Sequence, residues 1–301
     1  MPVLSTLLPT AGLIFGIQAA FAVPACIYAT ERYYDLSGGL TFLAATGYAA
    51  SLPARRAGLP LRAALKTLLT TGSAGALNWR HVAMGGMISI WSARLSSHLF
   101  SRIRKQGHDS RFDELKHSPP KFLVAWAFQA LWVTVSLLPL TFLAAAPAHA
   151  LPRLAATDVL GLTMWMAGMA FEVTADRQKT KWLEGKKKKE HDEEFMTTGL
   201  WQVCRYPNYL GEITLWTGAA IFASGMMARS SVLGSLGWGS SPWSRVAVAA
   251  MPFLCPAFSA FLLTQVSGIP LSQPKYDKKF GDREDYRKWR DSTPMLLPKF
   301  W

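Results

Sequence analysis

The residues of this chain best suited to chemistry lie in one stretch, 198–216, which changes halfway from polar to apolar. Its polar half carries Arg205, Asn208 and Tyr209, and its apolar half has the pattern of a helix with Glu212 near the start. Pro207 suits the first helical position, so the unpaired N–H groups of residues 208–211 would point outward with partial positive charge, which attracts phosphate and amide groups. The stretch therefore predicts a binding site for a ligand with phosphate and amide groups.

A second interpretation of the same stretch needs no ligand. The stretch fits an ordinary helix start at the interface between membrane and water. Arg205 and the aromatic residues nearby would then anchor the helix start to lipid headgroups. Taken alone, the stretch favours this simpler interpretation.

Another polar face is predicted where a long apolar segment ends. Glu172, Asp176 and Lys179 are spaced i, i+4 and i+7, which places them on one side of a helix. The face fits a solvated helix end with a local ion pair. However, its acids precede its base inside the apolar segment, where an unpaired carboxylate is costly. This order favours a binding site.

A further polar stripe is predicted on an earlier apolar segment, where Arg94 and His98 lie four residues apart and Arg102 follows. An arginine inside a spanning helix must face the bundle interior or extend to the headgroups. The stripe is consistent with an anion-facing wall and with an ordinary basic helix end.

The composition indicates a membrane protein. Half of the residues are hydrophobic, 17% are charged and the mean hydropathy is +0.15. The net charge of +13 comes from Lys and Arg residues between apolar runs, as the positive-inside rule expects, so we predict no nucleic-acid partner. Three Cys residues without short metal-ligand spacing predict neither a disulfide framework nor a metal site.

We expect an all-α polytopic bundle of about seven spans, because the apolar runs approach the ~20 residues that a spanning helix needs. The first run lacks a basic flank, so it predicts a span rather than a cleaved signal, and the second is marginally short. The expected spans are about 7–29, 38–52, 79–101, 122–146, 154–179, 207–227 and 246–266.

The connections between these spans are expected to differ in character. Residues 53–78 predict an interfacial loop or a short amphipathic helix, and 230–244 predict an interfacial hairpin. A lysine run followed by an acidic run, 185–194, predicts a mobile solvated loop. The polar tail from Gly268 places Tyr286, with Trp289 and Arg290, at helical spacing.

The distribution of charge predicts the topology. With seven spans, connections 1–2, 3–4 and 5–6 and the tail share one side and carry 23 of the 32 Lys and Arg residues. That side, with the C-terminus, is expected to be cytosolic, in an internal membrane such as the endoplasmic reticulum or in a bacterial inner membrane. A pocket is then expected at the cytosolic ends of the C-terminal spans. We divide the chain into residues 1–78, N-terminal spans with a basic loop, and 79–301, which hold the candidate site.

Several motifs in this order resemble the steroid 5-alpha-reductase superfamily, with the closest likeness to its membrane branch that carries the steroid 5-alpha-reductase C-terminal domain. More distant likeness extends to sterol reductases. The resemblance covers roughly residues 80–300. It rests on Trp91-Ser92-Ala93-Arg94-Leu95 with Arg102, Phe171-Glu172 to Lys179, Thr198-Gly199-Leu200-Trp201 to Arg205, Pro207-Asn208-Tyr209-Leu210-Gly211-Glu212, and Asp285-Tyr286 to Thr293-Pro294.

The resemblance implies an integral-membrane reductase that takes hydride from NADPH and delivers it to a carbon–carbon double bond of a lipid or steroid-like substrate. It also implies which residues hold the cofactor: Asp176 and Lys179 in its wall, Trp201 packed beside it, Asn208 with Tyr209 on the nicotinamide amide, and Glu212 orienting them. Arg205 and Tyr286, with Arg94 and Arg290, are implied as candidates for phosphate or ribose contacts.

Two positions depart from the pattern of that superfamily. Tyr206 stands where the pattern has His, and Trp91 stands where the steroid reductases have a Tyr that polarises the substrate carbonyl with an acid. Tryptophan cannot donate a proton at neutral pH, and the second span offers Tyr48 but no acid. We therefore leave the catalytic acid unassigned.

Two other classes stay open. A membrane methyltransferase of the isoprenylcysteine carboxyl methyltransferase type resembles the same region and would use S-adenosylmethionine. A non-enzymatic lipid-binding protein that has kept the fold is permitted by Trp91 and Tyr206. Asn208, Glu212 and the acidic face that ends the fifth span favour the reductase.

Overall fold

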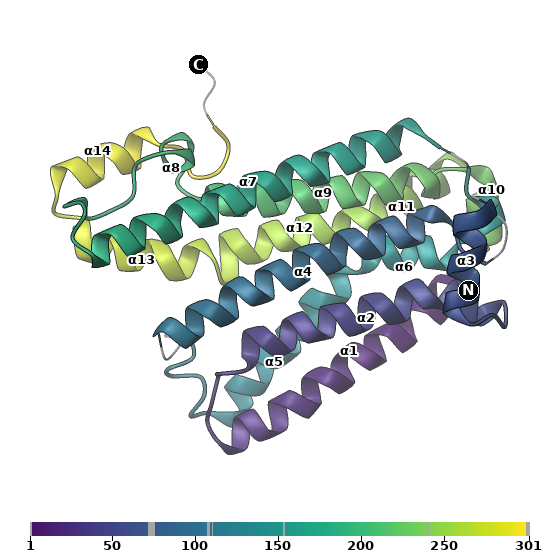
Figure 1. Ribbon diagram of the computed structural model, residues 1–301, viewed down its shortest axis with the longest axis horizontal. Coiled ribbons are helices and arrows are strands. Elements are labelled where there is room, and N and C mark those ends of the chain that lie inside the picture. The colour runs from purple at the N-terminus through teal and green to yellow at the C-terminus, as the bar shows by residue number, and fades with distance from the viewer. Residues whose placement is uncertain are drawn as a thin grey trace. The chain divides into compact units, whose positions relative to one another are not determined.

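The computed structural model describes residues 2–71, 76–106, 109, 111–152, 154–239 and 241–298, without the side chains of residues 71, 102, 105 and 106. Every regular element in these ranges is a helix, as predicted (Figure 1). The chain forms two compact units, Met1–Gly161 with Ala219–Cys255, and Leu162–Gly218 with Pro256–Trp301. The division at residue 78 was predicted from the sequence, and it stays a prediction.

The first unit is a bundle built around α1 (Pro2–Ile27), α2 (Tyr34–Arg56), α4 (Trp79–Gln106), α5 (Pro119–Ser136) and α6 (Leu138–Ala145). Helix α2 contacts α1, α4, α5 and α6, and α1 contacts α5 and α6 (Figure 1). The shorter members are α3 (Leu61–Thr71), η1 (Ala148–Ala150), α10 (Ser230–Ser235), α11 (Pro242–Ala250) and η2 (Met251–Phe253).

The second unit holds most of α7 (Ala156–Lys187) and the beginning of α9 (Pro207–Met227), with the short helix α8 (Leu200–Val203) between them. It continues from α12 (Leu254–Phe261) through the π-helical turn η3 (Leu262–Val266) to α13 (Ile269–Phe280) and α14 (Glu284–Ser292). Gly168 and Gly211 make the crossing of α7 and α9 close, because a Cβ at Gly168 would lie 2.5 Å from the Leu215 nitrogen. Two facing glycines of this kind let helix backbones approach in a membrane.

Helix α1 has the surface of a membrane protein. Its buried side chains include Thr6, Thr10 and Gln18, and Gln18 donates to the Thr41 hydroxyl on α2 at 2.8 Å. The side chains it leaves exposed are large and apolar: Leu4, Leu8, Phe15, Val23 and Ile27. Polar groups that pair inside the bundle and apolar groups on its outside are the arrangement that lipid favours.

Two helical stretches in the described ranges are long and apolar enough to cross a membrane, Pro2–Ile27 and Pro242–Phe280. A third is added if α5 and α6, which meet at a bend of 47°, form one broken span. These stretches fit a membrane protein. Helices also occupy the other predicted spans, α2, α4, α7 and α9, but their crossing of the membrane stays a prediction.

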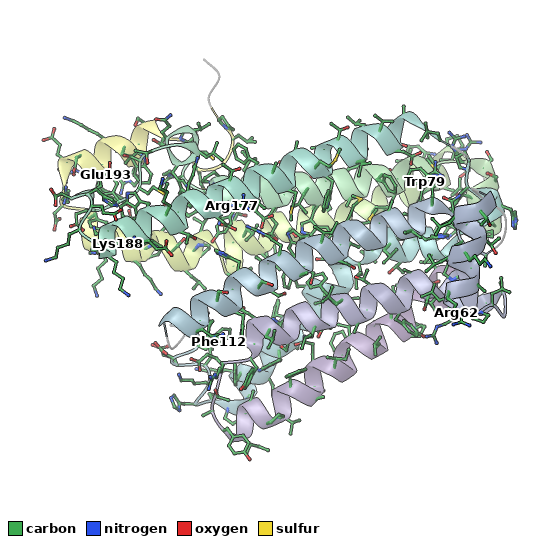
Figure 2. The ribbon with its side chains drawn as sticks, viewed as in Figure 1. Arg62, Trp79, Phe112, Arg177, Lys188 and Glu193 are labelled. Atoms are coloured by element: carbon green, nitrogen blue, oxygen red, sulfur yellow. The ribbon has the colours of Figure 1, made fainter. Side chains whose placement is uncertain are left out.

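Some predicted connections are more ordered than expected. Residues 53–78 contain the helix α3, one of the two expected alternatives. The lysine run predicts a mobile solvated loop, but α7 continues to Lys187 because lysine is a good helix former. The Lys186 ammonium donates to Glu194 at 2.8 Å, and the Trp182 indole donates to Glu193 at 2.8 Å. Figure 2 labels Lys188 and Glu193 in this region, near the end of α7.

A buried ion pair fastens two helix starts in the first unit. Arg80 is fully buried and binds the Asp158 carboxylate through Nε at 2.8 Å and Nη2 at 2.5 Å. The next residue, His81, accepts the Asn78 backbone N–H at Nδ1 and contacts the Leu143 carbonyl through Nε2 at 2.9 Å. A ring nitrogen that accepts is unprotonated, so His81 is neutral with its proton on Nε2.

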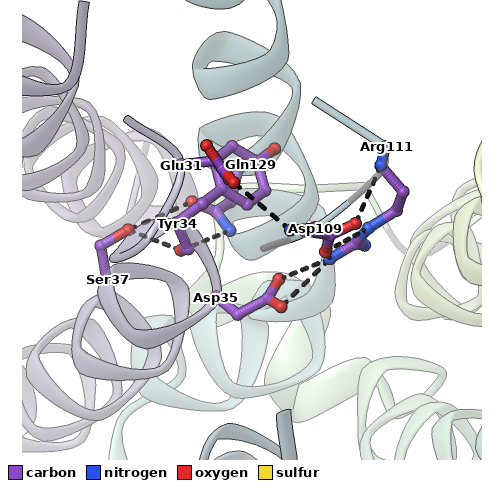
Figure 3. A network of polar contacts seen from close by, with 7 residues as sticks. All are labelled: Glu31, Tyr34, Asp35, Ser37, Asp109, Arg111 and Gln129. Carbon is purple, nitrogen blue, oxygen red and sulfur yellow. Dashed lines mark hydrogen bonds and ion pairs between the residues drawn. The ribbon is translucent and has the colours of Figure 1, made fainter. Parts of the chain in front are cut away.

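A second polar network fastens the turn between α1 and α2 (Figure 3). Arg111 donates to Asp109 at 2.8 Å and to Asp35 at 3.1 Å, and the Asp109 backbone N–H donates to Glu31 at 3.3 Å. Tyr34 donates to the Ala125 carbonyl on α5 at 2.8 Å. The network joins the turn between α1 and α2 to Asp109 and Arg111 and to α5, and its charges are satisfied locally.

Candidate functional site

A pocket opens in the second unit, among α7, the segment that follows it, α8, the start of α9, α13 and α14. The empty space between its walls is about 570 Å³, a figure that includes open solvent at the mouth. Its lining is rich in aromatic rings and includes two cations: Lys179, Phe195, Met196, Trp201, Arg205, Tyr206, Asn208, Tyr209, Ser272, Gln273, Tyr276, Tyr286 and Trp289.

Six of the eight predicted cofactor residues line this pocket. They come from separate parts of the chain and are brought together by the fold: Lys179, Trp201, Arg205, Asn208, Tyr209 and Tyr286. The other two, Asp176 and Glu212, lie on α7 and α9 outside the lining. The structure therefore places most of the predicted residues around one space, with two acids outside it in the same helices.

The turn before α8 sets the position of Trp201. Gly199 has a φ of +61°, which glycine adopts without strain, and the Gln178 side chain accepts the Leu200 N–H at 2.9 Å. The Trp201 indole then donates to the Ala175 carbonyl on α7 at 3.1 Å. Lys179 lies 4.5 Å from the centre of the Trp201 ring, so a cation and an aromatic face meet in one wall.

The segment before α9 is held by the end of the chain. The backbone N–H groups of Arg205 and Tyr206 donate to the carbonyls of Pro294 and Met295 at 2.9 and 3.2 Å. Pro207 begins α9, as the sequence predicted. The tail thus fixes the backbone from which Arg205 and Asn208 reach the pocket.

Arg205 is the main electrostatic feature of the pocket. Its Nη1 donates to Gln273 Oε1 at 3.0 Å, and its buried Nε has no hydrogen-bond partner within the described part of the chain. Among the same residues, no carboxylate oxygen lies within 4.0 Å of an Arg205 guanidinium nitrogen, the limit for an ion pair. A partly buried guanidinium with an unused donor and no counter-ion attracts an anion.

The neighbouring groups offer other complementary contacts. The buried Asn208 Oδ1 and the Trp289 Nε1 also have no hydrogen-bond partner among the described residues. The rings of Tyr206 and Tyr209 are stacked, with centroids 5.4 Å apart and planes 4° from parallel. The pocket therefore presents an amide acceptor, donors and flat apolar surfaces, which match an aromatic heterocycle with an amide and an anionic group.

The tail supplies one predicted residue, Tyr286, and three that the sequence analysis did not single out, Ser272, Gln273 and Tyr276. Phe195, Phe280 and Tyr286 form a buried aromatic cluster, with Tyr276 and Trp289 packed against it. Tyr286 donates to Asp277 at 2.8 Å, and burial together with this carboxylate raises the pKa of Tyr286, so the phenol stays protonated at neutral pH. Ser272, Gln273 and Tyr276 fall on one side of α13, at spacings of one, three and four residues. This spacing is the local signal that could have pointed to them in the sequence.

The other expected groups lie in the first unit. Arg94 and His98 are half-buried on α4, and the side chain of Arg102 lies outside the described residues. Trp91 is fully buried against Phe42 and Trp132, with ring centroids 5.2 and 5.9 Å away. Trp91 therefore has a packing role in this bundle.

In the described ranges, no group of three His, Cys, Asp or Glu side chains is arranged so that it could hold a metal ion. The described site is instead an aromatic pocket with an unneutralised arginine, in a helical protein whose apolar helices fit a membrane. These features place the chain among the all-helical proteins whose long apolar helices fit a membrane.

The chain belongs to the family described as "Protein of unknown function (DUF1295)", which matches residues 57–293. That family is linked to the steroid 5-alpha-reductase-like superfamily, in agreement with the resemblance at the level of the superfamily. No curated protein and no solved structure matches the chain.

Proposed function

We propose that this protein is an integral-membrane reductase that binds NADPH in the pocket of the second unit. In this proposal the hydride goes to one carbon of a carbon–carbon double bond in a lipid or steroid-like substrate, and a proton goes to the other carbon. The nicotinamide group supplies the hydride when it is bound. The protein has to hold the cofactor, orient it and exclude water.

The observation that carries the proposal is Arg205, which lines the pocket without a carboxylate partner in the described chain. A diphosphate or ribose phosphate in the pocket would neutralise its guanidinium. Lys179 adds a second cation in the same lining. An uncharged lipid alone would leave this guanidinium unneutralised, so the pocket suits an anionic ligand better.

Two further features support a nicotinamide ligand in particular. The carboxamide of nicotinamide has an N–H group that the unpartnered Asn208 Oδ1 would accept. The stacked rings of Tyr206 and Tyr209 offer a flat surface for a heterocycle. We assign to these residues binding and orientation, and we assign no residue to proton transfer.

The proposal includes the topology. Seven spans would place the ends of α7 and α13 and the start of α9 on the cytosolic side, where soluble NADPH is found. The excess of Lys and Arg in the corresponding connections supports this orientation. Protease treatment of oriented vesicles tests this topology. A tag at the C-terminus is expected to be digested in inside-out vesicles and protected in right-side-out vesicles.

Thermal unfolding of the purified protein in detergent tests the cofactor. A ligand that binds only the folded state raises the unfolding temperature, so NADPH is expected to raise it and S-adenosylmethionine is not. The opposite pattern would make the protein a methyltransferase. No response to either compound would favour a lipid-binding protein without this chemistry.

The substrate class can be read from membrane lipids. Cells that contain the protein are expected to hold a lipid with one more pair of hydrogens than its counterpart in cells without the protein. Mass spectrometry of total lipid extracts measures this difference. Identical lipid unsaturation in both cells would count against the reductase.

A further inference from the structure

Gln273 on α13 is the centre of the hydrogen bonds beside the pocket. Its Oε1 accepts from Arg205 Nη1 at 3.0 Å and from the Tyr206 hydroxyl at 2.9 Å. Its Nε2 donates to Asp277 Oδ1 at 2.9 Å and to the Tyr286 hydroxyl at 3.2 Å. One amide thus joins the segment before α9 to both tail helices.

The chemistry of the partners fixes the orientation of this amide. A guanidinium can only donate, and an ionised carboxylate can only accept. The Gln273 oxygen must therefore face Arg205 while the nitrogen faces Asp277, and a flipped amide would lose both contacts. The Arg205 side chain is held by an acceptor that has a single satisfactory orientation.

Gln273 is also neutral, which matters for the charge of Arg205. The nearest acid in this network is Asp277, one helical turn further along α13, where it accepts from Arg290 at 3.4 Å. A carboxylate at position 273 would hold Arg205 in much the same place but would neutralise it. The amide positions the cation and leaves its charge available to a ligand.

We propose that Gln273 is the positioning residue of an anion subsite, holding Arg205 so that its guanidinium can bind a phosphate or diphosphate group in the pocket. This rests on the proposed function, because NADPH is the source of that group there. Gln273 itself does not need to touch the ligand. Its role is carried through Arg205.

Two substitutions separate this role from simple support of the tail. Gln273→Glu keeps both acceptor contacts, loses the two donated by Nε2 to Asp277 and Tyr286, and adds a charge that competes with the ligand for Arg205. Gln273→Leu removes all four hydrogen bonds and adds no charge. The proposal expects Gln273→Glu to weaken anion binding by about tenfold or more, and Gln273→Leu to weaken it less. A purely structural role expects the reverse order.

The pH dependence of anion affinity in Gln273→Glu gives a second test, because a purely structural role of Gln273 would not produce it. Protonation of the carboxyl introduced by Gln273→Glu restores a neutral side chain, so affinity in this variant is expected to recover between pH 7 and about pH 4. The charged and titratable groups around this position are Arg205, Tyr206, Tyr276, Asp277, Tyr286 and Arg290, with Lys179 also in the lining. The same titration of the unmodified protein corrects for Asp277.

The experiment measures binding of inorganic pyrophosphate and, separately, of NADPH by calorimetry on the full-length protein in detergent. Gln202→Glu, at an exposed position on α8, is the matched control for added charge and is expected to bind almost normally. Circular dichroism confirms that each variant is folded. If Gln273→Glu does not fold, Gln273→Leu alone still has to bind pyrophosphate more weakly than the unmodified protein.

The outcomes separate the two proposals. Pyrophosphate binding without NADPH binding would overturn the proposed function and leave the anion subsite to be judged by the variants. Unchanged binding in Gln273→Glu, or weaker binding by Gln273→Leu than by Gln273→Glu at every pH, would overturn the role of Gln273 alone. An unmodified protein that binds neither compound would overturn both.

Discussion

Gly211 on α9 packs so closely on α7 that a Cβ added there would lie 2.6 Å from the backbone nitrogen of Glu172. The contact is with backbone, which cannot move aside as the end of a flexible side chain can. The helix that begins at Pro207 is therefore held against α7 one turn away from Asn208. This crossing helps to position the pocket.

Gly211→Ala is expected to separate α7 and α9 and to lower the free energy of unfolding by about 1–3 kcal/mol, the usual cost of overpacking. NADPH affinity should fall with it, because Asn208 moves. Thermal unfolding and a binding titration measure the two effects. Gly86→Ala on α4 is the control, since its added Cβ would meet nothing within 4 Å; equal behaviour of the two variants would refute the close crossing.

Arg80→Met is expected to lower the free energy of unfolding by about 3–5 kcal/mol, because it leaves the Asp158 carboxylate buried without its cation. The double variant Arg80→Met/Asp158→Leu should recover much of that loss, since no uncompensated charge remains. Denaturation of the three proteins in one detergent measures this. Strictly additive losses would show that the pair is not coupled.

The stability of the first unit should depend on pH through Glu31. Burial raises the pKa of this carboxyl, but hydrogen bonds from its own backbone, Lys116 and the Asp109 backbone N–H outweigh burial and hold the pKa below its ordinary value. A lowered pKa stabilises the fold above the pKa of the unfolded chain, and this contribution disappears as pH falls through the folded pKa.

The comparison with Glu31→Gln isolates this effect. The unmodified protein should unfold at a higher temperature than the variant at pH 7, and the difference should shrink towards about pH 3–4 as Glu31 is protonated. Scanning calorimetry across this range provides the measurement. A difference that is constant with pH would mean that the charge of Glu31 contributes nothing.

Asn208→Ala is expected to weaken NADPH binding by about two- to tenfold, the cost of one hydrogen bond to a neutral amide. Asp176→Ala should also weaken it, since the resemblance assigns this acid to the cofactor wall. Gln202→Ala, at an exposed position on α8, is the control. Normal affinity in both of the first two variants would contradict the assignment of the pocket.

The sequence predicted the parts of this fold that depend on local pattern. The start of α9 at Pro207 follows from the geometry of proline, and the tail helix with Tyr286 and Trp289 follows from periodicity. The extension of α7 to Lys187 was missed because a run of like charges suggested a solvated loop.

What could not be predicted depends on partners far apart in the chain. Gln273 carries four hydrogen bonds, two of them to residues 67 and 68 positions earlier, and nothing near it in the sequence marks them. Arg80 likewise pairs with an acid 78 positions away. Such pairs follow from tertiary packing, whereas the pocket residues on α7 and α9 could be found because they share helical faces.

The central claim is that Arg205 receives the anionic part of NADPH, and a binding titration with three proteins tests it most directly. The unmodified protein and Arg287→Ala, an exposed arginine on α14 outside the pocket lining, are expected to bind NADPH alike. Arg205→Ala should bind about ten- to a hundredfold more weakly, as expected for a lost charge-assisted hydrogen bond. Equal affinity in all three proteins would contradict the claim.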